Sequence, residues 1–299
     1  MKGSYLNDEF FSRLEALSLN LKTNLSGYFG GQHLVRSYGQ TVEFADFREY
    51  QLGDDIRRID WNMYSRFEKY FLRLFTDERQ MQIQIFIDCS ASMGKEMPEK
   101  AAYTMATASA LGFLAVESMD KVNFNLMKEN KSENPFGTII GKNAFFRAIG
   151  ALEEEKFDGE ADIEACVKNC TDTSTRNGLT VIISDFLTES NWKKAVEYLC
   201  YKKRQVLLVQ IMTPEELDPS YDGRVNLIDA ESVDIADTKN MKIRITKSMQ
   251  QAYQEALRDF KDDIKTFCAK HGVDYISIST ETPIERVLFS ELLKAGIMA

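Results

Sequence analysis

MQIQIFIDCSAS, residues 81–92, decides the fold of this chain. Three isoleucines alternate along its first half, at positions 83, 85 and 87, and β-branched residues in this pattern favour a buried strand over a helix. Asp88 ends the apolar run, and small polar residues follow it. We therefore predict a central strand with a carboxylate at its carboxyl end, where open α/β sheets hold their ligands.

The polar turn after this strand carries three oxygen donors. Asp88, Ser90 and Ser92 have the spacing D-x-S-x-S, and one carboxylate with two hydroxyls is a set of hard ligands that Mg²⁺ accepts while keeping several waters. The pattern is short, however, and a polar strand-end turn with a helix cap has the same appearance. These residues alone leave a metal site and a structural turn open.

A second segment repeats the same arrangement. GLTVIISDF, residues 178–186, is another apolar run that ends in a carboxylate, Asp185. Strands and helices alternate through the middle of the chain, which predicts parallel strands with helices on both faces. Residues 213–247 change to short mixed segments, which we interpret as an inserted antiparallel β-ribbon. The predicted class is an α/β fold with a doubly wound, mainly parallel sheet flanked by helices, over residues 80–299.

Residues 1–79 form a distinct N-terminal part. Apolar residues recur every three or four positions from Leu6 to Leu25, which predicts a helix. The following segment is dense in charges and aromatics, which is typical of strands and turns. It is either a docking face or an extension that packs its aromatic side chains on the main sheet. Arg57, Asp60 and Trp61 are candidate partner-binding residues, since Trp and Arg dominate interface hot spots. Salt bridges that tie the extension to the domain are the alternative.

Composition limits the classes of function. The 37 basic and 46 acidic residues give a formal charge of −9, which argues against non-specific binding to the phosphate backbone of a nucleic acid. We therefore expect no nucleic-acid partner. Five cysteines without C-x-x-C spacing, and only two histidines, indicate a reduced, intracellular protein without structural zinc. No apolar run approaches the length of a membrane span. We expect a cytoplasmic protein without a membrane span.

Two sets of residues together resemble one family. The motif DCSASM after a hydrophobic strand, with a later strand ending in Ser184 and Asp185, resembles the von Willebrand factor A domain and its metal-ion-dependent adhesion site. The segment VEFADFREYQLGDDIRRIDWNMYSR, residues 42–66, is similar to the signature of the bacterial domain of unknown function 58 family, members of which carry such a domain. The resemblance covers nearly the whole chain. It implies a von Willebrand factor A-like, Rossmann-like fold with an N-terminal helix and β extension.

The resemblance also implies a cation, Mg²⁺ or Mn²⁺, at the carboxyl edge of the sheet. Four residues match its ligands: Asp88, Ser90, Ser92 and, through water, Asp185. The family pattern places a threonine on a second loop, but the matching position here is Ala161, which has no side-chain oxygen. Asp162 or Glu160 then replaces the missing ligand, or the cation is bound weakly, or the site is vestigial. We expect metal binding with Asp162 as the additional ligand, because acidic residues surround this loop.

Members of this family are typically encoded beside MoxR-type AAA+ ATPases and look like adaptors in chaperone-like assemblies that mature or remodel other proteins. The resemblance therefore implies a non-enzymatic protein-interaction module, with such an ATPase and a client protein as partners. The enzyme alternative makes Asp88 the nucleophile of a haloacid-dehalogenase-like phosphatase. Those enzymes place a second aspartate two residues on, where this chain has Ser90. Neither serine lies in a G-x-S-x-G motif, and residues 137–143 lack the phosphate-loop spacing.

Overall fold

The computed structural model describes most of the chain and centres on one sheet. The described segments are residues 7–21, 43–51, 54–76, 81–95, 97–152, 154–170, 178–188, 190–219, 223–227 and 241–287. Seven strands pair in the order β11-β8-β7-β3-β4-β5, with β6 also paired to β4. Their bounds are β3 Gln82–Asp88, β4 Lys121–Lys128, β5 Lys131–Glu133, β6 Ile139–Ile140, β7 Gly178–Ser184, β8 Gln205–Met212 and β11 Asp274–Ser279.

The sheet is mainly parallel, as the alternation of strands and helices predicts. β3 pairs in parallel with β4 and β7, and β8 pairs in parallel with β7 and β11. β5 and β6 are antiparallel to β4 and lie at that side of the sheet. Because both faces of β3 are covered, its side chains from Ile83 onward are all buried, which explains the nearly continuous apolar run in the sequence.

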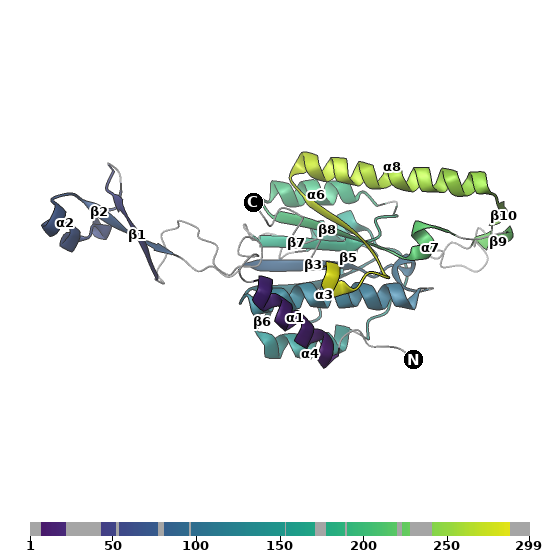
Figure 1. Cartoon of the computed structure of the whole chain (residues 1–299), viewed down its shortest axis with the longest axis horizontal. Coiled ribbons are helices and arrows are strands. Elements are labelled where there is room, and N and C mark those ends of the chain that lie inside the picture. The colour runs from purple at the N-terminus through teal and green to yellow at the C-terminus, as the bar shows by residue number, and fades with distance from the viewer. Residues whose placement is uncertain are drawn as a thin grey trace.

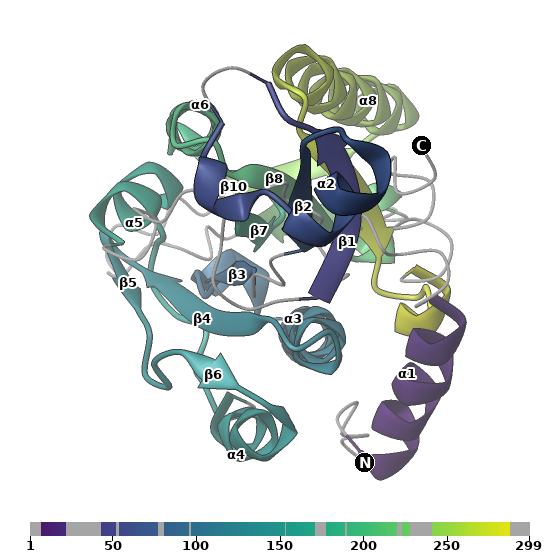
Figure 2. The ribbon, with the colours of Figure 1, turned by 90° about the vertical axis from the view of Figure 1, so that its left-hand side faces the viewer.

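Helices cover both faces of this sheet (Figures 1 and 2). One face carries α1 (Asp8–Leu21), α3 (Pro98–Glu117) and α4 (Lys142–Leu152); the other carries α5 (Ile163–Asn169), α6 (Trp192–Tyr201) and α8 (Lys247–His271). The short helix α7 (Pro214–Leu217) follows β8 directly. This arrangement confirms the predicted doubly wound, mainly parallel α/β fold.

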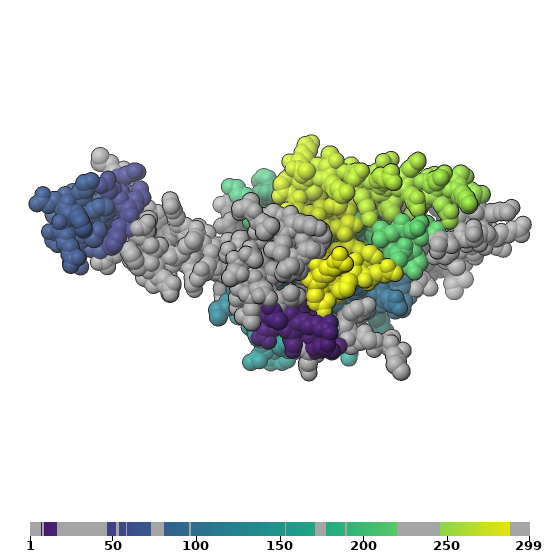
Figure 3. Space-filling model, in the orientation of Figure 1, coloured from purple at the N-terminus to yellow at the C-terminus, as the bar shows by residue number. Residues whose placement is uncertain are grey.

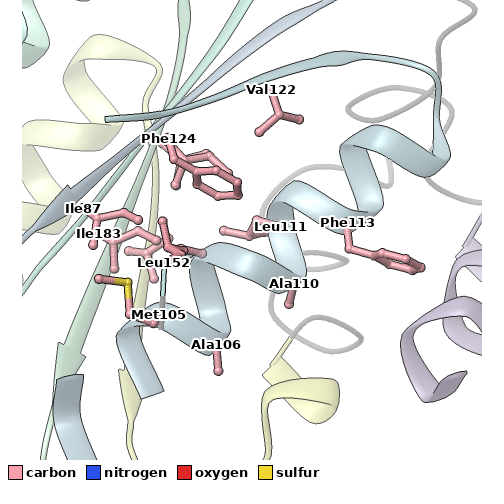
Figure 4. Close-up of a cluster of buried hydrophobic side chains, with 14 of the residues drawn as sticks. Ile87, Met105, Ala106, Ala110, Leu111, Phe113, Val122, Phe124, Leu152 and Ile183 are labelled. Carbon is pink, nitrogen blue, oxygen red and sulfur yellow. The ribbon is translucent and has the colours of Figure 1, made fainter. Parts of the chain in front are cut away.

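The core divides into two apolar layers, one on each face of the sheet. In the layer under α3, Ile87 and Ile183 of the sheet face Met105 and Leu111 of the helix, and Phe124 of β4 completes the contact (Figure 4). α3 is buried on nearly every side. Its small side chains let it approach the sheet closely. Its first turn lies next to the end of β3, because Lys100 in that turn contacts the carbonyl of Ser92.

α1 belongs to the same layer rather than to a separate unit. Phe10, Phe11 and Leu14 are buried in the core under α3, and Phe11 packs against Phe113 with ring centroids 5.4 Å apart. Figure 3 shows α1 next to the last described residues of the chain, and Arg13 forms an ion pair of 3.6 Å with Glu285 there. The predicted N-terminal helix is present. Its predicted continuation to Leu25 lies outside the described residues.

The segment after α1 forms a small unit at the opposite end of the molecule from α7 (Figure 1). β1 (Glu43–Glu49) and β2 (Phe71–Thr76) pair in antiparallel fashion, and the one-turn 3₁₀ helix Ile56–Arg58 and α2 (Trp61–Phe67) connect them. The aromatic density of this segment predicts strands and turns, whereas α2 was not predicted. The inserted ribbon is present as the antiparallel pair of β9 (Gly223–Leu227) and β10 (Met241–Ile245). A division of the chain at residue 79 stays a prediction.

Candidate metal centre

The register of the central strands brings the two predicted carboxylates to one edge of the sheet. Ile87 of β3 pairs with Ile183 of β7, so Asp88 and Ser184 end neighbouring strands at the same level, and Asp185 follows one residue later. Neighbouring strands lie only about 5 Å apart. Asp88 and Asp185 are both nearly inaccessible to solvent, with 2% of each residue exposed. The strand-end argument from the sequence thus places these two acids side by side.

Hydrogen bonds fix the Asp88 carboxylate in place. Its Oδ1 accepts from the backbone N–H of Ser90 at 3.0 Å, and its Oδ2 accepts from the hydroxyl of Ser184 at 2.6 Å. Burial raises the pKa of Asp88, and the nearby charge of Asp185 raises it further, while the bonds from Ser184 and Ser90 act in the opposite direction. A positive charge at this edge would favour the ionised form of Asp88.

Backbone hydrogen bonds hold the three loops of the site together. The amide of Ala91 donates to the carbonyl of Gly159 at 2.8 Å, and the amide of Asp158 donates to the carbonyl of Cys89 at 3.0 Å. The hydroxyl of Ser190, in the loop after β7, accepts from the amide of Ile163 at 3.3 Å. The D-x-S-x-S turn, the second loop and the loop after Asp185 therefore form one connected rim.

The two serine hydroxyls of the turn are spaced as neighbouring ligands of a small cation. Ser90 Oγ and Ser92 Oγ lie 3.1 Å apart and share a hydrogen bond. Two oxygens at adjacent corners of an octahedron lie about 3.0 Å apart when each is about 2.1 Å from a central Mg²⁺. Ser90 is buried and Ser92 half-buried, so both hydroxyls are held by the fold at the rim of the sheet.

The second loop supplies less than the sequence led us to expect. Ala161 occupies the position of the expected threonine, is buried, and forms an isolated parallel bridge with Glu129. Asp162, the predicted replacement ligand, is the N-cap of α5, and its Oδ1 accepts from the amide of Ala165 at 3.0 Å. The Asp158 carboxylate forms an ion pair with Lys95 at 2.8 Å. The acidic side chains Asp158 and Asp162 thus have structural partners of their own.

A buried lysine, absent from the sequence prediction, lies at the same site. The side chain of Lys100, in the first turn of α3, is 0% exposed. Its Nζ lies 2.9 Å from Asp185 Oδ2 and 2.7 Å from Glu216 Oε1. Burial opposes the charge on Lys100, but its ion pairs with Asp185 and Glu216 outweigh that effect and raise its pKa above the usual value. The Asp185 carboxylate therefore already has a cationic partner within the chain, which it shares with Glu216.

The donor set fits a hard divalent cation in its chemistry. Asp88, Ser90 and Ser92 would hold the ion directly or through water, and Asp185 would share its carboxylate with Lys100. Within the described segments no three Asp, Glu, His or Cys side chains are grouped so that they could hold a metal. A cation at this edge would thus depend on hydroxyls and water, which suits Mg²⁺ better than a soft metal.

The predicted partner-binding residues lie on the small N-terminal unit and differ in environment. Asp60 is buried and is the N-cap of α2, where its Oδ1 accepts from the amides of Asn62 and Met63 at 2.8 and 3.3 Å. Arg57 is exposed, and Trp61 is 60% exposed and packs edge-on against Tyr64 and Tyr70. The fold brings these residues close to one another but not to the metal edge (Figure 1).

Sequence reasoning missed Lys100 and Glu216, although the lysine left a signal. α3 is otherwise apolar or small along most of its length, and a lysine in a helix buried all round needs a counter-ion. Asp185, a strand-end acid, was the obvious candidate. Glu216 gave no such signal, because it is 116 residues away and belongs to an ordinary capping box with Thr213.

Comparison with known proteins gives a family but no activity. The model of the family described as "Protein of unknown function DUF58" matches residues 46–261. Uncharacterized proteins of Mycobacterium bovis and Mycobacterium tuberculosis are 24% identical over 286 residues, which is 94% of this chain and 88% of theirs. No described helix is both long enough and apolar enough to cross a membrane.

Solved structures that align with the chain include three of interest. A conserved hypothetical protein BatB from Bacteroides thetaiotaomicron is 15% identical with a TM-score of 0.43, covering 72% of this chain and 98% of that one. A von Willebrand factor type A protein from Catenulispora acidiphila is 11% identical with a TM-score of 0.34, covering 48% and 35%. The manganese-loaded TRAP protein of Plasmodium vivax is 15% identical with a TM-score of 0.34, covering 44% and 57%. By the match of its family model, this chain belongs to the family of proteins of unknown function DUF58.

Proposed function

We propose that this chain is a non-enzymatic protein-interaction module whose sheet edge binds Mg²⁺ or Mn²⁺ and presents it to a carboxylate of a protein partner. One observation carries the proposal: Asp88, Ser90 and Ser92 converge on one rim, with the two hydroxyl oxygens 3.1 Å apart. A bound cation would supply a positive centre with open coordination positions. The side chains of this rim would orient it and keep its charge partly uncompensated.

The environment of Asp88 supports binding rather than catalysis. A carboxylate nucleophile must reach its substrate, yet Asp88 is buried and both of its oxygens accept hydrogen bonds. Ser90 stands where a phosphatase of the haloacid-dehalogenase type needs its general acid. Burial and the neighbouring Asp88 raise the pKa of the Cys89 thiol, which keeps that side chain protonated and unreactive at neutral pH.

The proposed partner is a MoxR-type AAA+ ATPase, with a client protein whose maturation or remodelling the assembly assists in the cytoplasm. The support for this choice is the resemblance of residues 42–66 to the signature of a family whose members are typically encoded beside such ATPases. The small N-terminal unit offers a second candidate surface, where Trp61 and Phe67 are 60% and 59% exposed and Arg57 lies nearby in the sequence. Such exposed aromatics are typical of interface anchors. This surface and the metal edge lie at opposite ends of the molecule (Figure 1).

Affinity capture of the cognate ATPase tests this proposal and separates the two surfaces. We expect the tagged chain to retain the ATPase in Mg²⁺ and to lose it in EDTA or after Ser90→Ala. The matched control is Ser12→Ala, which removes the hydroxyl of an exposed serine in α1, outside both candidate surfaces. Loss after Trp61→Ala instead would assign the contact to the N-terminal unit. Failure of capture with the cognate ATPase under every condition would contradict the partner, and Asp88-dependent turnover of phosphomonoesters would contradict the non-enzymatic role.

A further inference from the structure

Lys100 takes part in the candidate metal centre in a way that the proposed function leaves unexplained. Its ammonium joins three parts of the rim: Asp185 after β7, Glu216 in α7 and, at 3.4 Å, the carbonyl of Ser92 in the D-x-S-x-S turn. The whole lysine is buried, and no part of the side chain reaches solvent. A fully buried lysine is costly and persists only where it is paired.

Lys100 pairs with one carboxylate oxygen of Asp185, the acid that we expect to reach the metal through a water. Asp185 Oδ2 is 2.9 Å from Lys100 Nζ, and its other oxygen, Oδ1, accepts from the amide of Leu187 at 2.9 Å. Both oxygens therefore already have a partner from the chain itself. A cation arriving at Ser90 and Ser92 would meet an acid that is already paired with an ammonium, and the ammonium would repel it.

Glu216 gives this ammonium a second anchor that does not depend on the metal. Its Oε2 accepts from the amide of Thr213 at 2.7 Å, as half of a capping box, so its orientation is fixed by α7 itself. Its other oxygen, Oε1, lies 2.7 Å from Lys100 Nζ. The lysine can thus release Asp185 and still keep a full ion pair with Glu216.

We propose that the ammonium of Lys100 competes with the divalent metal for the Asp185 carboxylate, and that the ion pair with Glu216 determines how easily Lys100 releases Asp185. This inference rests on the proposed metal site and adds its regulation. In the structure the lysine bridges Asp185 and Glu216. A bound cation would take Asp185 as its counter-charge, and Lys100 would keep its ion pair with Glu216. The metal affinity of the edge is therefore set by residues that never touch the metal.

Two substitutions should change metal affinity in opposite directions. Lys100→Met keeps the length of the side chain but removes the competitor, so Mn²⁺ should bind more tightly. An opposite charge at this distance changes the proton affinity of a carboxylate by roughly 10- to 1000-fold, and we expect Mn²⁺ affinity to rise by about tenfold or more. Glu216→Gln keeps an oxygen for the Thr213 amide but weakens the second anchor. Lys100 then holds Asp185 more firmly, and Mn²⁺ should bind more weakly.

The measurement is Mn²⁺ binding to the full chain, followed by loss of the free-ion signal in electron paramagnetic resonance. Lys95→Met is the matched control, because Lys95 is an exposed lysine close to the same turn and pairs with Asp158. Its removal changes the net charge by the same amount and should alter affinity by no more than about twofold, as expected for a screened surface charge. A rise in melting temperature on adding Mn²⁺ that is larger for Lys100→Met than for wild type would agree with the proposal.

The outcomes separate the two proposals. Wild-type binding with unchanged affinity in Lys100→Met and Glu216→Gln would overturn the competition and leave the metal site standing. An equal gain from Lys95→Met and Lys100→Met would also overturn it, because general charge repulsion would then suffice. Absence of Mn²⁺ binding in all variants at millimolar metal would remove the metal site itself. If Lys100→Met does not fold, weaker binding by Glu216→Gln supports the competition and unchanged binding refutes it.

Discussion

Asp120 offers a sharp test of how the central strand is held in place. Its carboxylate, fully buried just before β4, accepts from the backbone N–H of Met81 through Oδ1 at 2.7 Å and so fixes the start of β3. Its Oδ2 is buried without a hydrogen-bond partner among the described residues. Burial raises the pKa of Asp120 from 3.8 to about 6, although the bond from Met81 acts in the opposite direction.

This pKa makes the free energy of unfolding depend on pH in a defined direction. Because the folded pKa of this acid lies above the unfolded one, the folded state binds the proton more tightly, and stability is lost as pH rises from about 4 to about 6. At about 1.4 kcal/mol per pH unit, the ionised Asp120 costs about 3 kcal/mol above pH 6. At pH 4.5 the same cost is only about 1 kcal/mol.

Asp120→Asn removes the charge and keeps an oxygen for the Met81 amide. The new amide group adds a buried donor, whose cost of about 1–3 kcal/mol does not depend on pH. The stability of Asp120→Asn relative to wild type should therefore improve by about 2 kcal/mol between pH 4.5 and pH 7.5. Urea denaturation followed by circular dichroism at both pH values measures this difference.

The control is Asp259→Asn, which makes the same change of charge at an exposed position on α8. We expect its relative stability to vary by less than about 0.5 kcal/mol between the two pH values. A similar small change for Asp120→Asn would refute the reasoning, because the carboxylate would then be hydrated or paired in the folded protein. The Asp120 carboxylate would then not be buried against the start of β3.

Three further substitutions test the packing around the sheet. Leu14→Ala in α1 removes a fully buried side chain and should lower the free energy of unfolding by about 2–5 kcal/mol, measured by urea denaturation; a loss below about 1 kcal/mol would mean that α1 is not part of the core. Gly112→Ala places a Cβ atom 2.6 Å from Cζ of Phe124 and should cost about 1–3 kcal/mol in the same assay, whereas an unchanged midpoint would show that α3 can move away from β4. Asp60→Ala removes the N-cap of α2 and should cost about 1 kcal/mol locally, seen as faster amide hydrogen exchange in α2 without a change in β3; equal acceleration in both would contradict an independent N-terminal unit.

The architecture and the first half of the site could be predicted because they depend on local rules. A buried parallel strand has a recognisable sequence, a run of β-branched residues. The carboxyl ends of parallel strands lie at one edge of the sheet, so the sequence alone predicted that Asp88 and Asp185 are neighbours. The ribbon insertion was also recognisable, because its short mixed segments interrupt the alternation of strands and helices. The register of β3 against β7 is set by the pairing of the whole strands and not by any single residue.

The parts that escaped prediction depend on contacts across the fold. α2 has only seven residues and no buried side chain, so its helical period is too short to stand out in the sequence. Its capping Asp60 and the stacking of Tyr64 on Tyr70 hold it. Lys100 and Glu216 meet only because α3 and α7 both begin at the carboxyl edge of the sheet. Asp162 illustrates another limit: the sequence did not reveal that this acid caps α5, and its role as a metal ligand stays a prediction.

Calorimetric titration of Mg²⁺ into the wild type, Ser90→Ala and Ser92→Ala tests the central claim most directly. The account predicts measurable binding at millimolar Mg²⁺ for the wild type and for the control Ser12→Ala, and a loss of at least about tenfold in affinity for each serine variant of the D-x-S-x-S turn. Circular dichroism of each variant would establish that the sheet is intact. Equal heats for all four proteins, or no binding by the wild type, would contradict a metal centre at this edge.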